Sequence, residues 1–494
     1  MIMSKTLKLR AFTCAPLIFL FVFICIYLDF GSSQKLYDSL WEPKDSNWQV
    51  VDEGSSGLLA NMISKYENEQ VIRFYHENPD ETNDVLLYAK DRNLDIWDTS
   101  SRYTDIRLHR EIVKDMISKI PNHRVLISNV SRALTNSMPN GREMKSLPPL
   151  NFNALSSMPQ EAFSELYLQY TEEFYKNYQN IEAINSYLRL LSSMYSDLCE
   201  LTSLGTTSEG RSILGLRIHG RRSDTHGQYH VKDENEVIIL QGNAHAREWI
   251  SIPTLCYSAW KLVAQYDSDN RVRNLLDKFE WIFVPVLNVD GYAYTRSEDR
   301  FWVKNRQSIK TSNCKGINID NNWGFGFTGE GNPCDELFGG LAPFEANETY
   351  AMFNLISNTL PKEGKTTVGF LDVHSYSQSV LWPYAYTCDL LPADDENFQE
   401  LAMGLTKELH RVNGRFYSHQ QACIPFDGIH KHYHPGAAID FAYFVGEVRW
   451  PFTIRLRDMG DYGYLLPAHQ IIPTSREFYA MLLYYGQFIS EAAY

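Results

Sequence analysis

The sequence lacks an excess of positive charge, internal repeats and low-complexity blocks, and each absence narrows the class of protein. Lysine and arginine together number 46 against 60 aspartates and glutamates, so the formal net charge at pH 7 is −14. This balance argues against nucleic acid and against an anionic membrane surface as partners. The composition that remains, 44% hydrophobic and 21% charged over 494 residues, is that of globular protein with a large core.

The N-terminal residues have the order of a secretory leader. A basic stretch, "MIMSKTLKLR", is followed by the apolar run "AFTCAPLIFLFVFICIYL" and by the small residues of "DFGSSQ". This order predicts a leader within residues 1–33, although the run is also long enough for an uncleaved signal anchor, and both interpretations stay open. In either case we expect a secreted or lumenal protein, with the vacuole as an alternative, and no membrane contact except through an uncleaved leader.

Cysteines are few, and their usage agrees with an oxidising compartment. Two of the eight lie in the leader, which leaves six: Cys199, Cys256, Cys314, Cys334, Cys388 and Cys423. Six thiols permit many pairings, so spacing alone does not assign the disulfides. The sequons at Asn129 and Asn347 predict glycosylation and fit the same route, although such a match is common by chance.

The pattern of apolar and turn-forming residues changes twice along the chain. Residues 34–133 carry short alternating, strand-like units, "EQVIRFYHE", "NDVLLYAKD" and "NHRVLISNV", around the helical pattern "HREIVKDMISKI", which predicts a small α/β sandwich. Residues 134–165 are rich in turn and breaker residues and predict a linker. Residues 166–494 alternate apolar strands with amphipathic stretches, which predicts an α/β sheet covered by helices on both faces.

Candidate metal ligands follow two of the predicted strands. His245 and Glu248 stand three residues apart directly after "EVIILQG", and such a pair can share one cation, although alone it is usually a hydrogen-bonded surface pair. His374 closes another apolar strand in "GFLDVHS". Two histidines and a glutamate form the ligand set of a zinc site that keeps one position open. The alternative for His374 is a hydrogen-bonded histidine of the core.

A set of motifs in this order resembles the zinc carboxypeptidases of the carboxypeptidase A type with their N-terminal prodomain. The motifs are "SEGRSI", "GNAHAREWIS", "PVLNVDGYAY", "RFWVKNR", "LDVHSYSQSVLWPYAY" and "RLRDMGDYGYLLPAHQIIPT". The resemblance implies a mixed twisted sheet, preceded by a small α/β sandwich. It also implies one zinc per chain, held by His245, Glu248 and His374. By the same resemblance Cys314 pairs with Cys334 and Cys388 with Cys423, while Cys199 and Cys256 are expected to be small buried residues.

The resemblance fails at the position of the general base. Active members of the family carry a glutamate there, in a motif that resembles "FTxELRD", whereas this chain reads "FTIRLRD" with Arg455 in its place. A guanidinium has no acceptor lone pair and stays protonated, so it cannot take a proton from water. We expect Arg455 to face the zinc cleft. If the stretch is a strand, Arg457 faces the same way, and it matches an arginine that the family keeps.

Further positions of the reaction site depart from the family. Val303 stands where the family has the arginine that polarises the scissile carbonyl, and Asp320 and Asn321 replace the asparagine and arginine that clamp the terminal carboxylate. Asp320 would repel that carboxylate. His432 occupies the place of the mobile tyrosine by direct count, with Tyr433 one step away. The positions that match the family's pocket and contact residues are Ile439, Arg247, Ser375 and Tyr376.

These departures predict a catalytically inactive, zinc-binding member of the family. It most resembles the fungal inactive members linked to cell-wall organisation and biogenesis. The first alternative is a zinc hydrolase with a rewired site, in which Arg455 binds an acidic or non-peptide substrate and His432, His434 or a carboxylate is the base. The second is a scaffold whose metal site is a relic. We expect a monomer with an unknown protein, peptide or cell-wall ligand in the cleft. Because the linker contains no dibasic pair, we also expect the small domain to be retained.

Overall fold

The computed structural model describes residues 60–137, 146–221, 236–329, 331–423 and 434–492. The chain divides into two units, of which one comprises Val50–Leu147 with Tyr167–Tyr494 and the other Met1–Gln49 with Pro148–Leu166. The predicted leader lies outside the described residues. Among the helices that are described, none is both long enough and apolar enough to cross a membrane.

The small domain, residues 60–137, is built on a four-stranded antiparallel sheet with the order β2-β3-β1-β4. Its strands are β1 (Glu69–Tyr75), β2 (Asp95–Thr99), β3 (Tyr103–His109) and β4 (His123–Ile127). Its helices are α3 (Pro79–Asp91), α4 (Arg110–Lys119) and α5 (Val130–Ser137). This arrangement confirms the predicted α/β sandwich and leaves one face of the sheet to be covered by another part of the chain.

Both faces of the small sheet are buried. Ile72 and Phe74 of β1 pack in a cluster with Val85 of α3 and Met116 of α4. Because side chains alternate along a strand, Val71 points to the opposite face. There it belongs to a second cluster, which includes residues far along the chain.

One prediction about the small domain is wrong. The segment "NDVLLYAKD", grouped with the strand-like units, forms most of α3, because Asn78 caps the helix by accepting a hydrogen bond from Glu81 N at 3.0 Å. The segment predicted as a linker contains regular structure. Within residues 134–165, α5 continues to Ser137 and two further helices appear: α6 (Phe152–Leu155) and α7, which starts at Gln160 and ends at Phe174.

The large domain, described residues 167–492, contains an eight-stranded mixed sheet with the order β11-β10-β12-β9-β7-β8-β6-β5. The central run β12-β9-β7-β8 is parallel, and antiparallel partners join at β10 and β6. The strands are β5 (Cys199–Thr206), β6 (Ser212–Ile218), β7 (Glu236–Gly242), β8 (Glu280–Val284), β9 (Thr366–Ser375), β10 (Ser379–Trp382), β11 (Ser418–Gln421) and β12 (Trp450–Leu456).

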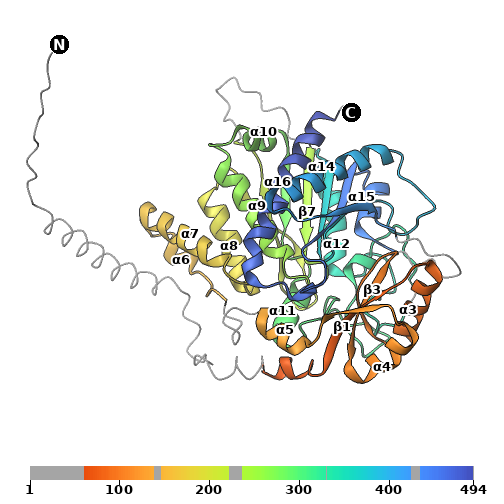
Figure 1. Ribbon diagram of the computed structural model, residues 1–494. Helices are drawn as coiled ribbons and strands as arrows, with labels where there is room; N and C mark the ends of the chain where they lie inside the picture. Colours follow the sequence, from red (N-terminus) through yellow and green to blue (C-terminus); the bar gives the residue numbers. More distant parts are fainter. Residues whose placement is uncertain (1–59, 138–145, 222–235, 330, 424–433, 493–494) are drawn as a thin grey trace, which may run out of the picture. The chain divides into compact units, whose positions relative to one another are not determined.

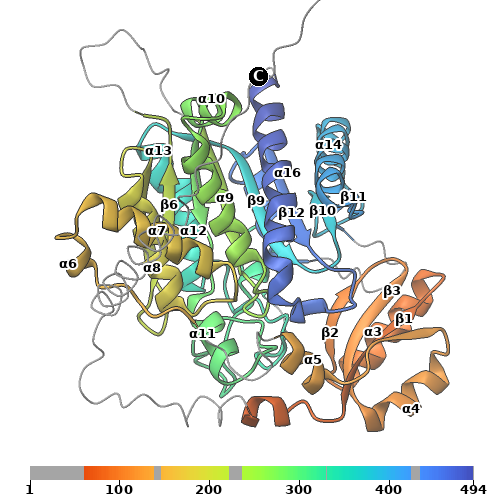
Figure 2. The ribbon, with the colours of Figure 1, turned by 60° about the vertical axis from the view of Figure 1, so that its left-hand side comes forward.

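Helices cover both faces of this sheet, as predicted (Figure 1). On β9, Gly369 faces Tyr485 of α16, whereas its neighbour Phe370 contacts Trp323, which packs on Phe441 of α15. Helices α15 and α16 therefore lie on opposite faces. Figure 2 shows α9 and α16 running side by side in front of the strands. The helices are α8 (Ile181–Met194), α9 (Ser251–Gln265), α10 (Asn270–Lys278), α11 (Val289–Ser297), α12 (Asn347–Asn354), α13 (Leu360–Lys362), α14 (Asp395–Asn413), α15 (Ala438–Phe444) and α16 (Ile471–Glu491).

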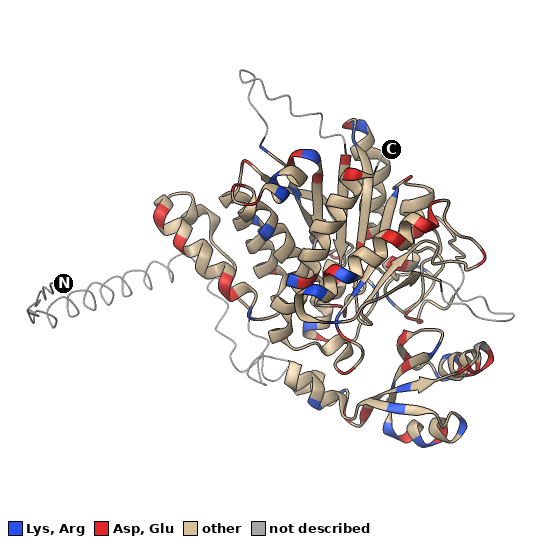
Figure 3. Ribbon diagram, turned by 45° about the horizontal axis from the view of Figure 1, so that its top comes forward, with Lys and Arg blue, Asp and Glu red and all other residues tan. Residues whose placement is uncertain are grey.

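Short helical turns connect these elements, and charge is spread over the outer helices. The turns are the 3-10 helices η2 (Ile319–Asn321), η4 (Gly463–Leu465) and η5 (Ala468–Gln470) and a π-helical turn η3 (Leu355–Thr359). In the view of Figure 3, α14 carries both acidic and basic residues, whereas α7 carries acidic residues only.

Candidate metal centre and the altered cleft

The first two candidate ligands lie on a tight turn between β7 and α9. Asn243, with a positive φ of 57°, directs its side-chain amide to the carbonyl oxygens of His245 and Ala246, both at 3.2 Å. Ser251, the first residue of α9, accepts a hydrogen bond from Asn243 N at 3.0 Å. The turn is therefore tied to both flanking elements, and His245 and Glu248 project from it to one side.

The three predicted ligands converge. Glu248 Oε1 lies 2.9 Å from His245 Nδ1, and Glu248 Oε2 lies 2.9 Å from His374 Nδ1, so both imidazoles present the same ring nitrogen to one carboxylate. Ser375 N also donates to Glu248 Oε2 at 3.1 Å. Burial opposes ionisation of Glu248, but His374 and His245 outweigh it and hold the pKa of this carboxyl well below its usual range. The carboxylate is thus in the charged form that a metal requires.

This donor set fits zinc. Two imidazole nitrogens and one carboxylate oxygen meet within 4.8 Å of one another, and this combination is the one that zinc accepts in three-coordinate protein sites. The site lies at the carboxyl ends of β7 and β9, which are neighbours in the sheet. When bound there, zinc would supply a Lewis acid and a site for water.

The partners of the two histidines were not predicted. His245 Nε2 meets the amide oxygen of Asn318 at 3.2 Å, and this amide is oriented by the carbonyl of Glu336, which its nitrogen contacts at 3.0 Å. His374 Nε2 lies 3.1 Å from a carboxylate oxygen of Asp372, whose other oxygen accepts from Gln241 at 3.0 Å. The carboxylate therefore stands beside the second histidine, and a neutral amide beside the first.

The residues at the clamp positions bond to the protein itself. Asp320 accepts from Ala438 N at 3.3 Å, and Asn321 Nδ2 donates to the carbonyl of Pro435 at 3.1 Å. Burial and the neighbouring Asp372 raise the pKa of Asp320. These contacts fasten the segment before α15 instead of leaving a pair of donors free for a terminal carboxylate, and the carboxylate of Asp320 would repel such a group.

Val303 and Ile439 are both buried in the structure. Val303 is buried and contributes only its carbonyl, which accepts from Ala246 N at 2.9 Å. Ile439 is buried in a cluster of small apolar side chains, with Leu381, Ala385, Ala422 and Ala437. No side-chain donor for a scissile carbonyl is present at position 303.

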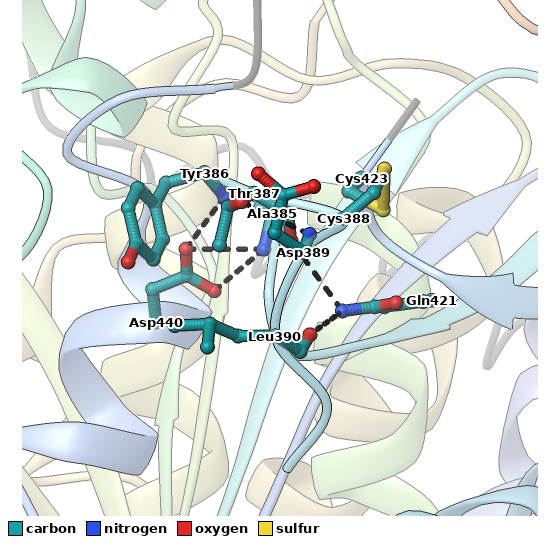
Figure 4. Close-up of a disulfide and its surroundings, with 9 residues drawn as sticks. All are labelled: Ala385, Tyr386, Thr387, Cys388, Asp389, Leu390, Gln421, Cys423 and Asp440. Atoms are coloured by element: carbon teal, nitrogen blue, oxygen red, sulfur yellow. Dashed lines mark hydrogen bonds between the residues drawn. A yellow bond between two sulfur atoms is a disulfide. The ribbon is translucent and has the colours of Figure 1, made fainter. Parts of the chain in front are cut away.

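The structure contains both disulfides that the resemblance implies. Cys314 is bonded to Cys334 and Cys388 to Cys423, while Cys199 and Cys256 are free and buried. Figure 4 shows the second bond together with Asp440, which accepts hydrogen bonds from the backbone of Ala385 and Tyr386. Burial raises the pKa of Asp440 to about 7.

Arg455 binds a carboxylate of the small domain. Its Nη1 donates to Asp98 Oδ1 at 2.9 Å, and the other oxygen of Asp98 accepts from the hydroxyl of Tyr103 at 2.8 Å. In the sheet, Arg455 of β12 is the register partner of the ligand His374 on β9. Burial opposes the charge of Arg455, but Asp98 outweighs this effect and raises the pKa of the guanidinium. The expectation that Arg455 faces the metal side of the cleft agrees with this position.

The two arginines of the motif do not share a surface. β12 ends at Leu456, so Arg457 lies beyond the strand and the parity argument does not reach it. Its Nε donates to Glu477 of α16 at 2.9 Å. Arg457 therefore ties the end of the strand to a helix of the large domain.

A bulge in β2 turns three neighbouring side chains toward the large domain. The register of β2 against β3 shifts between Ile96 and Asp98, so Trp97 is the extra residue. Such a bulge places two consecutive residues on one side of the strand, and Asp95 is already there. Asp95, Trp97 and Asp98 thus form one surface, while Ile96 packs with the helices of the small domain.

Each residue of this surface contacts a side chain of the altered cleft. Asp95 accepts from Arg247 Nη1 at 2.8 Å. The Trp97 indole lies against Tyr376 and Tyr464, with ring centroids 6.4 and 5.1 Å away. Tyr376 also donates its hydroxyl to the buried Asp105 of β3 at 2.7 Å. The retained contact residues Arg247 and Tyr376 are therefore engaged within the chain.

The hydrophobic core is continuous between the two domains. One cluster of buried residues combines the small-domain side chains Met62, Tyr66, Val71, Trp97, Ile127, Val130 and Leu134 with Phe301, Tyr376, Tyr464 and Leu465 of the large domain. This cluster covers the second face of the small sheet. The small domain lacks a complete core without the large one.

Some predicted site residues are placed only in part. His432 and Tyr433 lie outside the described residues. His434 is half-buried, and burial together with Arg455, His245 and His374 lowers its pKa to about 3. The sequon residues Asn129 and Asn347 are both exposed, and the Asn347 amide donates to the carbonyl of Thr206 at 3.2 Å. Their glycosylation stays a prediction.

The fold and the converging histidines and glutamate define a zinc carboxypeptidase-like protein, and the chain belongs to the zinc carboxypeptidase family, whose profile matches residues 184–481. It is 50% identical over 512 residues to the inactive metallocarboxypeptidase ecm14 of Schizosaccharomyces pombe, covering 99% of each chain. A second relative, the inactive metallocarboxypeptidase ECM14 of Uncinocarpus reesii, is 32% identical over 448 residues, which cover 87% of this chain and 75% of the relative.

Solved structures share the whole architecture. Thrombin activatable fibrinolysis inhibitor superimposes with a TM-score of 0.69 at 22% identity, covering 86% of this chain and 100% of that one. Carboxypeptidase A from Helicoverpa armigera gives a TM-score of 0.68 at 20% identity, covering 87% of this chain and 99% of that one. These likenesses establish the fold. Together with the inactive relatives and the replaced base, they make the chain a pseudoenzyme of the family.

Proposed function

We propose that this protein is a non-hydrolytic zinc-binding protein of the secretory pathway that acts in cell-wall organisation as a monomer. The observation that carries the proposal is the contrast between converging zinc ligands and a base position filled by Arg455, which is already paired with Asp98. Loss of a general base typically costs ~10² to 10⁴ in rate, and loss of a transition-state donor ~10² to 10³. Zinc would then organise the cleft rather than activate water for attack.

Three features support a route through the secretory pathway. The two disulfides form and persist in oxidising compartments. Both sequon asparagines are exposed, so an oligosaccharide could be attached to either without unfolding the chain. The apolar N-terminal run has the composition of a leader. The cell-wall role itself rests on the resemblance to fungal inactive members.

The hydrolytic alternative needs another base near the metal. His434 is the described histidine that this alternative offers as the base. Its pKa of about 3 makes the imidazole a poor proton acceptor in a reaction at neutral pH. Asp320 is engaged with Ala438 N. Neither group replaces the missing base, so the non-hydrolytic function is favoured.

The test combines metal analysis with a substrate screen. Protein purified without added zinc should contain close to one equivalent per chain, and His374→Ala should contain much less. The same preparation should release no C-terminal residue from peptides with neutral, basic or acidic ends, with or without chelator. Turnover that disappears both with chelator and in His374→Ala would establish the hydrolase instead.

The biological role is tested separately in a fungal strain that lacks its own related gene. The full chain should restore growth on agents that stress the cell wall. A variant with Arg455→Glu is the informative comparison, because the proposal requires no base at this position. Full restoration by Arg455→Glu alone, with failure of the natural chain, would contradict the proposed role.

A further inference from the structure

Two aspartates of one strand are bound by two arginines of the cleft. Asp98 pairs with Arg455 and Asp95 with Arg247, at 2.9 and 2.8 Å. The side chains of Asp95, Asp98 and Arg247 expose only 7%, 5% and 6% of their surface, and that of Arg455 exposes 23%. Ion pairs withdrawn from water to this degree carry far more specificity than surface pairs.

We propose that β2 is the resident ligand of the altered cleft and locks the small domain onto the large one, so that the two stay together even when the connecting chain is cut. The inference rests on the proposed absence of hydrolysis, because a peptidase needs this cleft open to its substrate. It also defines the ligand class of the cleft, which is an acidic strand with a tryptophan between two carboxylates.

Shape and charge agree in this contact. The bulge in β2 aligns the two carboxylates with the indole of Trp97, and Tyr464 donates its hydroxyl to the Trp97 carbonyl at 2.5 Å. Gly463 makes room for the ring, since a Cβ at this position would lie 2.7 Å from Trp97 Cζ3. The cleft therefore contacts both the side chains and the backbone of this strand.

The base and the lock exclude one another at position 455. A glutamate there would bring a second carboxylate to the place where Asp98 is bound, in a site that water screens poorly. Arg455 removes that repulsion and supplies the attraction at the same time. The replacement that abolishes proton abstraction is therefore the same one that retains the small domain.

The lock is tested on the full chain with a sequence-specific protease site inserted between residues 138 and 145. After cleavage, the two parts of the natural sequence should stay together on size exclusion. Asp98→Arg and Arg455→Asp should each speed release of the small domain by ~30-fold or more. The double charge swap should recover most of the retention, because it restores one pair of opposite charges.

A matched control lies at the same interface. Arg124 of β4 pairs with Asp461 at 3.1 Å, but their side chains are 60% and 67% exposed. Arg124→Asp should change the release rate less than about threefold, since exposed pairs contribute little. Equal effects of Arg124→Asp and Arg455→Asp on the release rate would overturn the proposal. So would a double charge swap that releases the small domain as fast as the single variants Asp98→Arg and Arg455→Asp.

Substitutions that neutralise the charges, instead of reversing them, provide a second test if a charge reversal prevents folding. Asp98→Asn, Arg455→Gln and their combination are compared in the uncut chain by thermal unfolding, and the two changes should be strongly non-additive. Additive effects would contradict the lock. If the cleaved natural protein releases the small domain but shows no peptidase activity, only this inference is contradicted. If the cleaved protein shows peptidase activity, the proposed function is contradicted.

Discussion

At the residue scale, the position of the carboxylate beside the two histidines distinguishes this metal centre. Asp372 and His374 lie two apart on β9 and thus share a face of the strand. A carboxylate close to the remote nitrogen of a ligand imidazole, as Asp372 is at 3.1 Å from His374 Nε2, increases the basicity of the ring. Asn318 can orient His245 but brings no charge. His374 is therefore expected to be the stronger imidazole donor.

Asp372→Asn should weaken zinc binding by ~10- to 100-fold, because His374 loses the charge behind its donor nitrogen. Competition with a chromophoric chelator measures the affinity. Asn318→Asp is the matched control, since it adds a carboxylate behind His245 and should strengthen binding. An affinity unchanged in both variants would mean that neither group acts on the metal.

The pair of Arg455 and Asp98 has a defined pH dependence. Burial raises the pKa of Asp98 to about 6, although Arg455 acts to lower it. The pKa of Asp98 is therefore higher in the folded protein than in the unfolded chain. Its contribution to the free energy of unfolding is fully present below about pH 4 and is lost as the pH rises through 6. Without Arg455, the pKa of the folded state rises further and the loss extends to higher pH.

Arg455→Gln should therefore cost little near pH 5, where Asp98 is protonated in both proteins. The cost should grow as pH rises above 6 and reach about 3 kcal/mol near pH 8, where a buried charge is left without its partner. Chemical denaturation at several pH values measures it. A penalty independent of pH would show that the guanidinium stabilises the fold through packing alone.

At the scale of elements, the turn after β12 is shaped for docking. Asp458 accepts hydrogen bonds from the backbone of Gly460, Tyr462 and Gly463, at 3.0, 2.8 and 3.0 Å. This arrangement holds the start of η4 against Trp97. Gly463 has a φ of 55°, which a side chain rarely adopts, and the indole fills the space beside it.

Gly463→Ala should destabilise the protein by about 3 kcal/mol, since the new methyl group collides with Trp97 and the backbone angle is strained. Gly210→Ala is the control. Gly210 has a φ of 85° with no atom near its Cβ position, so this change should cost only the strain, about 1 kcal/mol. Urea unfolding of both variants compares them, and equal losses would exclude the collision.

Elements with a strong local signal were predictable from the sequence. The apolar runs that became β7 and β9 were found, and their ends placed His245 and His374 correctly because parallel neighbours terminate at one edge. Helix α3 was missed, although Asn78 followed by Pro79 and Glu81 is an N-terminal signal. Its apolar residues follow the period of a helix and not the alternation of a strand.

The contact of Arg455 with Asp98 was beyond sequence reasoning. The two residues are 357 positions apart, and no local pattern links them. The bulge at Trp97 also hides the arrangement, because strict alternation would send Asp95 and Asp98 to opposite faces. The altered base could be recognised from the sequence, but its partner required the structure.

At the scale of the whole molecule, zinc should stabilise the fold. His245, Glu248 and His374 come from two strand ends, so a metal that binds only the folded chain adds to its stability. Chelation should lower the melting temperature, with recovery on adding zinc. At a zinc concentration ~1,000 times the dissociation constant the gain is about 4 kcal/mol. A melting temperature insensitive to chelator would indicate a relic site.

The core shared by the two domains bears on how the chain is made. Val71 and Trp97 leave the ribosome early, but Tyr464, which covers the Trp97 ring, is synthesised 367 residues after it. Until that segment has been made, the nascent small sheet therefore presents an uncovered apolar face in the compartment where it folds. Biosynthesis should accordingly depend on chaperones that shield such faces, and truncation shortly before Gly463 should send the product to degradation.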